Sequence, residues 1–375
     1  MRKSPTIYDV AELAGVSKSL VSLVLRGSPR VSDEKREAVL AAVAELDYTP
    51  SRLAAGLAGT RTRSVGVVID EFENLWFAPA LAGLRSALAS GGYSLSVADA
   101  ALNAHLGLDP LEVFRSLRVD GVVLAGEVPE GAAQRLTVPA VVLGTRALRL
   151  PSAPLIASDE FAGGRLAAAH LAELGHRDIA CVTGPGASAA AREAGYLAEM
   201  RDRGLVPRVV RAEHTTEAAA REVAAELFAA GGSGSGTAAQ APGSGVAGFG
   251  QVASEPPAGR HGARGSRASA LSRSGADPAP TAVFAVNDPM AVGAIGAARD
   301  RGLEVPRDLS VVGYDDSPLA AYDFVSLTSV SGDPQELGEA AGRALVALLE
   351  GDSDPAPTGL FAPNLVVRRS TARPA

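Results

Sequence analysis

The stretch that decides the fold is TIYDVAELAGVSKSLVSLVLRGSPRVSDEKREAVLAAVAELDYTPSRLAAGLAG, residues 6–59. Thr6, with Asp9 three residues later, forms a capping-box pattern, and apolar residues follow at helical spacing, which predicts a first helix over about residues 7–14. Gly15 tolerates a left-handed backbone, and Ser17 can cap a second helix. A third helix is predicted to start at Ser32. The stretch therefore predicts an all-α unit that contains a helix-turn-helix.

The second predicted helix has two different faces. Leu20, Val21 and Val24 share one side of a helical wheel, which suits packing against the other helices. The opposite arc is left for a partner or for solvent, and it carries Lys18, Ser19, Ser22, Leu23 and Arg26.

After Pro50 the chain reads SRLAAGLAG, about two helical turns before Gly59. Helices this short are marginal in water when isolated, so we expect this one to form only against another surface. We interpret residues 51–63 as a hinge helix and linker.

These segments resemble the DNA-binding headpiece and hinge of the LacI/GalR family of bacterial transcriptional regulators. The resemblance is carried by T-x-x-D-V-A-x-x-A-G-V-S at 6–17, V-S at 21–22 and 31–32, Y-x-P at 48–50, and R-L-A-x-x-L-A-G at 52–59. It implies that a recognition helix opens at Ser17 and that a leucine, Leu57, enters the minor groove and kinks the duplex.

By the same resemblance, three groups of residues are expected to contact DNA. The base-reading positions are Lys18, Ser19 and Leu23; the phosphate-contact positions are Ser22, Arg30 and Ser32; and Thr6, Arg26 and Ala54 are further interface positions. The family often has arginine where this chain has Leu23, and leucine cannot make a bidentate guanine contact. The alternatives are a plain helical bundle with a solvated face and, for Leu57, an ordinary packing leucine.

Charge is distributed unevenly along the chain. The net charge is −7 overall, but residues 1–63 hold ten Lys or Arg and seven Asp or Glu, which makes this part +3 and the remainder −10. A basic DNA-binding segment attached to an acidic body fits this asymmetry.

The one cysteine, Cys181, lies in a strand-like run and predicts a buried thiol. We expect no signal peptide, no membrane span and a cytoplasmic protein.

Residues 64–375 alternate between short apolar runs and Ala- and Leu-rich helical stretches. Continuous apolar runs between helices predict parallel strands buried on both faces, and hence an α/β body of two doubly wound lobes. The runs begin at residues 65, 95, 121, 140, 179, 209, 281 and 309. The division is thus a headpiece at 1–50, a hinge at 51–63 and a body at 64–375.

The body resembles the periplasmic-binding-protein-like effector domain of the same family, through motifs such as F-A-V-N-D-x-M-A at 284–291 and V-V-G-Y-D-D at 311–316. The resemblance implies three crossings between the lobes, which we place near 158–163, 287–289 and 322–328. A ligand is expected in the cleft at these crossings.

Candidate ligand contacts follow from where the motifs match. Asp159, Arg192, Asn287 and Asp315 are expected to bind hydroxyl groups, and Trp76 in the loop with Phe77 could stack on a sugar face. The alternatives are helix caps for Asp159 and Asp315, a surface or salt-bridging residue for Arg192, a turn residue for Asn287, and core packing or a lobe-interface position for Trp76.

Residues 231–280 are rich in Gly, Ser, Ala and Pro and have hardly any large apolar side chains, so we interpret them as a disordered insertion. Four arginines there, Arg260, Arg264, Arg267 and Arg273, could touch phosphates, although a solvated loop is the simpler interpretation.

The sequence contains no catalytic constellation, and we expect no enzyme activity, metal or cofactor. The leading hypothesis is a repressor that binds a palindromic DNA operator as a homodimer and responds to a small molecule, a sugar above all. The alternatives are a DNA-binding regulator with an unliganded cleft and a solute-binding protein.

Overall fold

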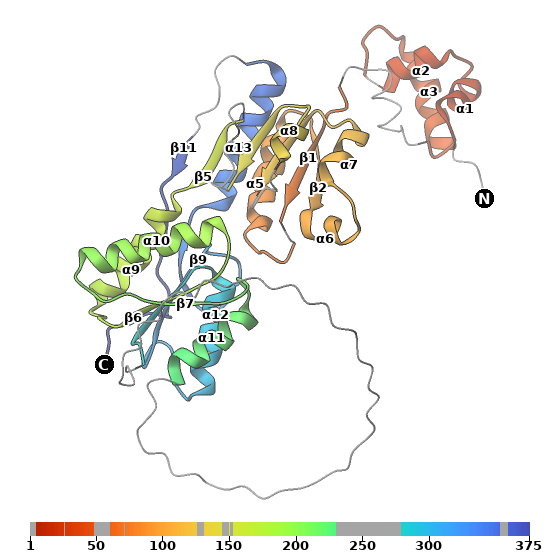
Figure 1. Cartoon of the computed structure of the whole chain (residues 1–375). Coiled ribbons are helices and arrows are strands. Elements are labelled where there is room, and N and C mark those ends of the chain that lie inside the picture. The colour runs from red at the N-terminus through yellow and green to blue at the C-terminus, as the bar shows by residue number, and fades with distance from the viewer. Residues whose placement is uncertain are drawn as a thin grey trace, which may run out of the picture.

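The computed structural model describes residues 5–25, 27–48, 61–70, 72–125, 131–144, 150, 153–229, 279–352 and 359–375. Within these ranges a helical headpiece is followed by two α/β lobes, with the N-terminus at the headpiece and the C-terminus on the far lobe (Figure 1). Most of the predicted hinge (51–63) and of the predicted insertion (231–280) lies outside the described residues. The same is true of Arg26, Ala54 and Leu57.

The headpiece contains α1 (Ile7–Leu13), α2 (Lys18–Leu25) and α3 (Asp33–Glu45). The Thr6 amide donates to Asp9 Oδ2 at 2.6 Å, and Ser17 Oγ accepts from the amide of Leu20 at 3.3 Å. These bonds satisfy N–H groups that have no partner inside the helices. The apolar centre contains Val10, Val21, Val24 and Val39.

The first lobe has a sheet with the strand order β11-β5-β4-β3-β1-β2, all in parallel. Its strands are β1 (Ser64–Ile69), β2 (Ser94–Asp99), β3 (Gly121–Ala125), β4 (Ala140–Leu143), β5 (Leu155–Ser158) and β11 (Gly359–Phe361). Helices α5 (Phe77–Ser90) and α13 (Pro334–Glu350) cover one face, and α7 (Pro110–Leu117) covers the other. Two shorter helices are α6 (Ala100–His105) and α8 (Ala132–Arg135).

The second lobe repeats this plan with the strand order β12-β10-β9-β8-β6-β7, in which only the pair β10 and β12 is antiparallel among the described strands. Its strands are β6 (Ile179–Thr183), β7 (Arg208–Arg211), β8 (Ala282–Ala285), β9 (Ser310–Tyr314), β10 (Thr328–Ser331) and β12 (Asn364–Val366). Its helices are α9 (Glu160–Leu174), α10 (Ala187–Asp202), α11 (Glu217–Ala229) and α12 (Asp288–Asp300). All eight predicted apolar runs form strands, so the predicted doubly wound architecture is confirmed.

Two of the predicted lobe crossings are wrong. Residues 287–289 connect β8 to α12, and residues 322–328 lead from β9 to β10, so both segments lie inside the second lobe. The described chain passes between the sheets after β5, after β10 and between β11 and β12. The error follows from missing β10 and β11, which are short strands without a long apolar run.

Glycines let paired helices approach closely in both lobes. A Cβ on Gly338 of α13 would lie 2.0 Å from the carbonyl oxygen of Ala80 in α5, and one on Gly164 of α9 would lie 2.0 Å from that of Arg192 in α10. No larger side chain fits at such contacts, so these glycines fix the distance between the helices.

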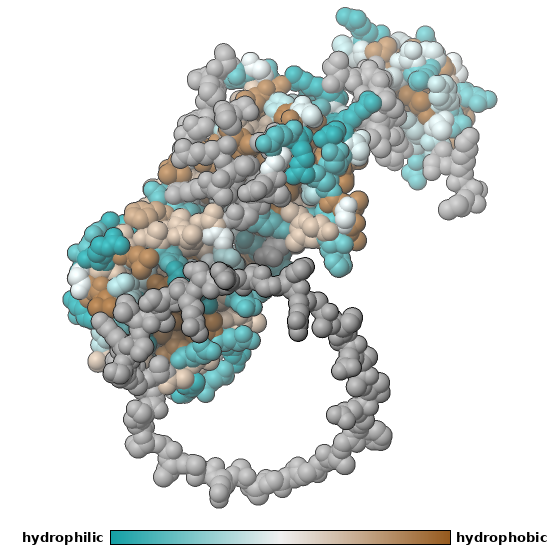
Figure 2. Space-filling view, viewed as in Figure 1, coloured by the Kyte–Doolittle hydropathy of each residue, from teal (hydrophilic) through white to brown (hydrophobic). Residues whose placement is uncertain are grey.

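Hydrophilic side chains lie over α7 and α8 on the first lobe, and apolar and polar residues alternate over the second lobe (Figure 2). In the described ranges, no helix combines the length and apolar composition that crossing a lipid bilayer requires.

Cys181 is buried in β6, and burial raises the pKa of its thiol. The buried thiol predicted from the sequence is therefore confirmed.

Candidate DNA-reading surface and effector cleft

The exposed face of α2 is the candidate DNA-reading surface. Ser17, Lys18 and Ser19 are exposed, Leu23 is 36% exposed, and Ser22 is half-buried on the same helix. Such a polar face on the second helix of a helix-turn-helix is the part that enters the major groove in known complexes. Among the other predicted contacts, Arg30 and Ser32 are exposed and Thr6 is half-buried.

Tyr8 joins this surface, although it is not among the contacts predicted from the sequence. The residue is 63% exposed, its hydroxyl accepts from Lys18 Nζ at 3.1 Å, and the same Nζ lies 4.8 Å from the ring centroid. The tyrosine therefore orients the lysine from the neighbouring helix. A tyrosine two residues after an N-cap is a weak signal, because only the fold brings α1 beside the start of α2.

The candidate effector site is a cleft between the two lobes, at the carboxyl ends of strands, where open α/β sheets bind ligands. It encloses about 130 Å³. Its lining residues are Asp70, Asn74, Trp76, Phe77, Gly144, Glu160, Pro185, Gly186, Ser188, Ala189, Arg192, Thr215, Val286, Asn287 and Asp315. Five of the six predicted ligand contacts therefore lie in one cavity.

Arg192 forms the charged centre of the cleft. Its Nε donates to Glu160 Oε2 at 2.5 Å, its Nη1 to the carbonyl of Val286 at 2.7 Å, and its Nη2 pairs with Asp315 Oδ1 at 2.9 Å. The guanidinium also lies 3.7 Å from the ring centroid of Tyr314. Burial alone would lower the pKa of Arg192, but Asp315 and Glu160 raise it above its ordinary value. The side chain is thus a fixed cation.

The position of Arg192 depends on how α10 packs against α9. The turn Gly184-Pro185-Gly186 ends β6 and starts α10, and Gly186 has a φ of +107°, which a side chain rarely allows. Gly164 of α9 faces the backbone carbonyl of Arg192, so no side chain separates the helices there. The guanidinium is therefore aimed by rigid elements rather than by a loop.

Asp315 follows β9 and has a φ of +98°, an unusual backbone for a residue with a side chain. The carboxylate is buried, and burial raises its pKa to about 7, although the Arg192 guanidinium opposes this shift. Strained and perturbed groups gather at functional sites, which favours a binding role for this aspartate.

Asn287 lines the cleft and also holds it together. Its Oδ1 accepts from the amide of Met290 at 2.8 Å, which caps α12, and its Nδ2 donates to the carbonyl of Thr215 at 2.9 Å. One hydrogen on Nδ2 and one lone pair on Oδ1 remain for a ligand.

Asp159 is placed differently from the other predicted contacts. Its Oδ1 accepts from the amide of Ala162 at 3.0 Å as the N-cap of α9, and the cleft lining does not include it. The next residue, Glu160, lines the cleft instead and is buried. The sequence presents two adjacent acids, and only the start of the helix determines which one caps and which one faces the ligand.

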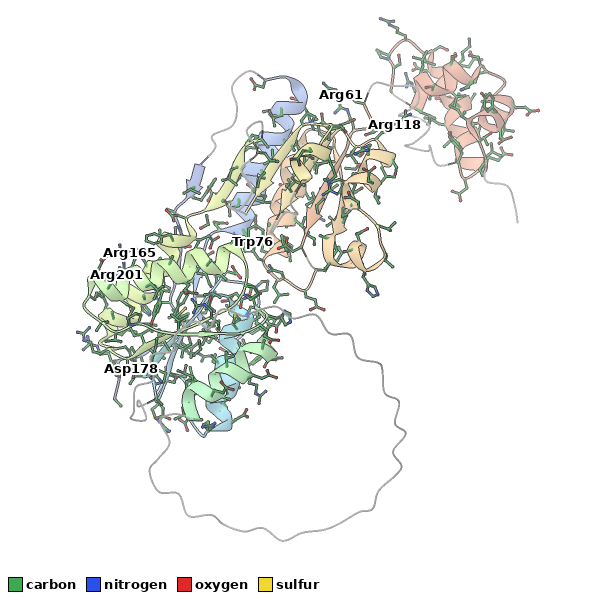
Figure 3. The ribbon with its side chains drawn as sticks, viewed as in Figure 1. Arg61, Trp76, Arg118, Arg165, Asp178 and Arg201 are labelled. Atoms are coloured by element: carbon green, nitrogen blue, oxygen red, sulfur yellow. The ribbon has the colours of Figure 1, made fainter. Side chains whose placement is uncertain are left out.

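Trp76 lies at the end of the first lobe that faces the second lobe (Figure 3). Its ring meets Phe77 edge to face at 5.3 Å, and the Asn74 side chain accepts from its amide at 3.1 Å. A Cβ on Gly144 would lie 2.8 Å from the indole. The indole is therefore a fixed apolar wall of the cleft, as stacking on a sugar would require.

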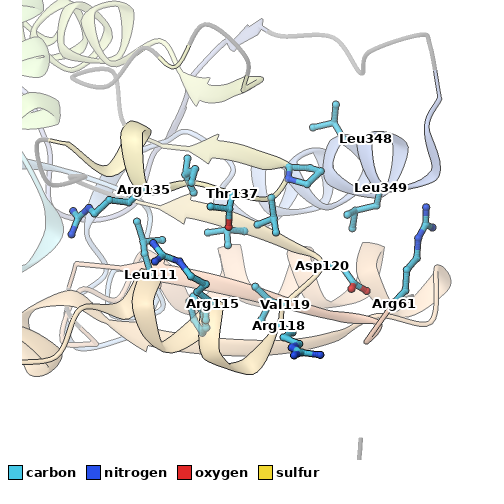
Figure 4. A pocket seen from close by; sticks show the side chains of 15 residues that line it. Arg61, Leu111, Arg115, Arg118, Val119, Asp120, Arg135, Thr137, Leu348 and Leu349 are labelled. Carbon is cyan, nitrogen blue, oxygen red and sulfur yellow. The ribbon is translucent and has the colours of Figure 1, made fainter. Parts of the chain in front are cut away.

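A larger cavity of about 500 Å³ lies elsewhere in the first lobe, between α7, α8 and the end of α13 (Figure 4). Side chains such as Leu111 and Leu349 form its apolar floor, and Arg61, Arg115, Arg118 and Arg135 line it. Arg61 and Arg118 lie at the end of the lobe nearest the headpiece (Figure 3). This cavity contains none of the predicted effector contacts, and its arginines point in different directions (Figure 4). The inter-lobe cleft, whose buried charges converge, is the stronger candidate.

A helix-turn-helix headpiece on a two-lobed body with a cleft defines a ligand-sensing, DNA-binding regulator. The family model "Bacterial regulatory proteins, lacI family" matches residues 6–51, and two periplasmic-binding-protein-like models match residues 62–237 and 168–371. The chain belongs to the LacI family of bacterial transcriptional repressors, with a DNA-binding headpiece and an effector-binding body.

Similar proteins cover the chain from end to end. The HTH-type transcriptional repressor PurR of Erwinia tasmaniensis is 31% identical and covers 98% of this chain and 97% of its own. That of Serratia proteamaculans is 32% identical with the same coverage. The lac repressor dimer bound to operator and the anti-inducer ONPF is 27% identical, with a TM-score of 0.74 over 99% of this chain and 100% of its own. A complex of the regulator CelR with cellobiose is 26% identical, with a TM-score of 0.63 over 98% and 99%.

Proposed function

We propose that this repressor binds a palindromic operator as a homodimer and is controlled by a small sugar-like molecule in the inter-lobe cleft. The observation that carries the proposal is the cleft itself. Buried Arg192, Glu160 and Asp315 lie opposite the indole of Trp76 within one cavity. Carboxylate and amide groups beside an aromatic wall suit hydroxyl groups on one side and C–H groups on the other.

The dimer follows from what one headpiece can read. A single recognition helix covers one half-site, whereas two headpieces related by a twofold axis match a palindrome. An exposed aromatic pair on the second lobe supports this proposal: Tyr322 is 53% exposed and Phe324 is 77% exposed, and their stacked ring centroids lie 5.8 Å apart. Monomeric surfaces seldom expose such a pair together.

The ligand would control DNA binding by changing the angle between the two lobes. Ligand in the cleft touches both lobes, so it favours one relative orientation, and the first lobe carries the connection to the headpiece. The hinge at residues 51–63, with Leu57 as the minor-groove wedge, would then hold or release the two headpieces together. A repressor that acts on the chromosome works in the cytoplasm, which completes the proposal.

The sugar assignment draws on cleft chemistry and on the cellobiose complex of CelR. The PurR repressors are more similar over the whole chain, so purine bases and nucleosides belong in the same ligand panel. The remaining rival is a regulator whose cleft takes no ligand. A solute-binding protein is a weaker rival, because the DNA-binding headpiece would then be unexplained.

Three measurements test the proposal. Footprinting with the purified full-length chain on DNA around its own gene should reveal a protected palindrome, and sedimentation should give a dimer. Calorimetric titration with sugars, nucleosides and bases should then find a ligand that alters operator affinity. An operator without any effective ligand would favour the unliganded regulator, and the absence of a protected palindrome would refute the operator.

A further inference from the structure

The charges in the cleft are not balanced. Among the residues that line it, Asp70, Glu160 and Asp315 are acidic, and Arg192 is the one basic residue in that set. The remaining lining residues are neutral. Among the described residues of the lining, a ligand therefore meets more acidic side chains than basic ones.

The single guanidinium is already occupied by these acids. Nε is bonded to Glu160 and Nη2 to Asp315, while Nη1 donates to the carbonyl of Val286. The ring of Tyr314 lies 3.7 Å from the guanidinium and covers one of its faces. Two N–H bonds of the five remain for a ligand, and the charge that would attract an anion is neutralised by its neighbours.

Glu160 adds the second of the two carboxylates that pair with Arg192. It is 5% exposed, and it is the first residue of α9, directly after the chain leaves the first lobe. Its carboxylate is thus held inside the cleft by the helix and by the guanidinium, where solvent screens charge poorly.

We propose that Glu160 sets the charge specificity of the cleft, so that it accepts neutral or cationic hydroxyl-bearing ligands and rejects phosphorylated or carboxylated ones. A hydroxyl or ammonium group donates hydrogen bonds to the carboxylates. A phosphate group carries a charge of about −1.5 to −2 at neutral pH, so it meets a repulsive field there. This inference rests on the proposed function only in taking the cleft as the effector site.

The test uses the full-length chain and inorganic phosphate as the probe. Trp76 is the only tryptophan of the chain and lines the cleft, so its fluorescence reports occupancy. Titrations at constant ionic strength compare the wild type with Glu160→Gln. Glu173→Gln is the matched control, because Glu173 lies on the same helix and is 68% exposed in its side chain.

Wild type and Glu173→Gln should show no saturable response to phosphate. Glu160→Gln should bind phosphate saturably, at least about tenfold more tightly than the detection limit that the wild type sets, because one buried negative charge beside Arg192 is removed. Glu160→Asp should behave like the wild type, since it keeps the charge. The same order should hold for glucose 6-phosphate, while binding of glucose and glucosamine should not gain from Glu160→Gln.

Saturable phosphate binding by the wild type, or no gain in Glu160→Gln with an unchanged circular dichroism spectrum, would overturn the inference. If Glu160→Gln does not fold, the inference is tested with Glu160→Asp and the wild type. Saturable phosphate binding by either of these two proteins contradicts the inference. Failure of the proposed function is a separate result. In that case no neutral ligand would alter operator binding, but the phosphate comparison would still stand.

Discussion

Asp288 holds Ser317 at two points inside the second lobe. Its Oδ2 accepts from the Ser317 amide at 2.7 Å and from the Ser317 hydroxyl at 2.8 Å, while Oδ1 accepts from the hydroxyl of Ser329 at 2.6 Å. The turn fixed in this way contains Asp315 and Asp316, which both have positive φ. The buried carboxylate therefore stabilises a strained turn that presents Asp315 to the cleft.

Asp288 should make stability depend on pH. Burial raises its pKa to about 6 from the ordinary 3.8, so the folded chain binds this proton more tightly than the unfolded chain. The contribution of protonated Asp288 to the free energy of unfolding is fully present below pH 3.8 and is lost as pH rises through about 6. Relative to Asp288→Asn, the wild type should lose roughly 2–3 kcal/mol of unfolding free energy across this window, as measured by urea denaturation.

The comparison with Asp288→Asn isolates the part of the pH dependence that requires Asp288, including the part by which Asp288 raises the pKa of Asp315. His170 and His176 have pKa values lowered by burial, so they contribute the opposite slope, but they do so equally in both proteins. The hydrogen bonds that Asp288→Asn loses lower its unfolding free energy by the same amount at every pH. Curves for wild type and variant that stay parallel from about pH 4 to pH 8 would show that Asp288 does not titrate there.

Gly195 should be intolerant of any side chain. A Cβ there would lie 2.1 Å from the carbonyl oxygen of Phe161 and 2.8 Å from the amide nitrogen of Arg165, so Gly195→Ala must separate α10 from α9. We expect a loss of about 2–4 kcal/mol in unfolding free energy, with weaker ligand binding because Arg192 moves with its helix. Gly359→Ala is the control, since nothing lies within 4 Å of its Cβ position. Equal stability of the two variants would contradict the role of this contact.

The sequence predicts those strands best that are buried on both faces of a sheet. Runs such as those of β3 and β9 are buried on both faces, and a continuous apolar run in a chain of helices has one physical explanation. The short strands β5 and β10 carry no such signal, because LIAS and TSVS look like loops. The crossing that follows β10 is therefore misplaced, whereas the crossing predicted at 158–163, directly after β5, is where the chain leaves the first lobe.

Site residues could be predicted where a motif determines the position of the side chain. They could not be predicted where two adjacent residues of the same type could take the same role. Asp315 directly follows β9, Arg192 lies inside α10, and the two side chains meet in the cleft. Asp159 and Glu160 are adjacent acids, and the first turn of α9 assigns capping to one and the cleft to the other. Tyr8 reaches the reading surface only through the packing of α1 on α2.

Lys18 should carry much of the operator affinity from the headpiece. Lys18→Ala removes a base-reading cation and should weaken operator binding by about tenfold or more, with ligand affinity unchanged. Tyr8→Phe removes only the hydroxyl that accepts from Lys18 Nζ, so its effect should be smaller. Fluorescence anisotropy with labelled operator measures both. Lys35→Ala, an exposed lysine of α3, is the control, and equal losses in it and Lys18→Ala would indicate nonspecific charge alone.

Leu57 lies outside the described residues, and its role as a wedge stays a prediction. Leu57→Ala should weaken operator binding and reduce bending of the DNA, because less apolar surface is inserted between base pairs. Circular-permutation gel shifts measure the bend. Unchanged bending would discard the wedge, whatever happens to affinity.

Gly144 and Trp76 allow the cleft wall to be tested directly. Gly144 has a φ of +81°, and a Cβ there would lie 2.8 Å from the indole, so Gly144→Ala should both strain the backbone and displace Trp76. We expect the emission of this single tryptophan to shift to longer wavelength as the ring gains solvent, and ligand affinity to fall about tenfold. Gly107→Ala is the matched control, because Gly107 has a φ of +68° but nothing within 4 Å of its Cβ position. It should cost about the same backbone strain, roughly 1 kcal/mol, and leave emission and ligand affinity as they are. If both variants lower ligand affinity equally, general destabilisation is the cause, and the indole of Trp76 is not a wall of the binding site.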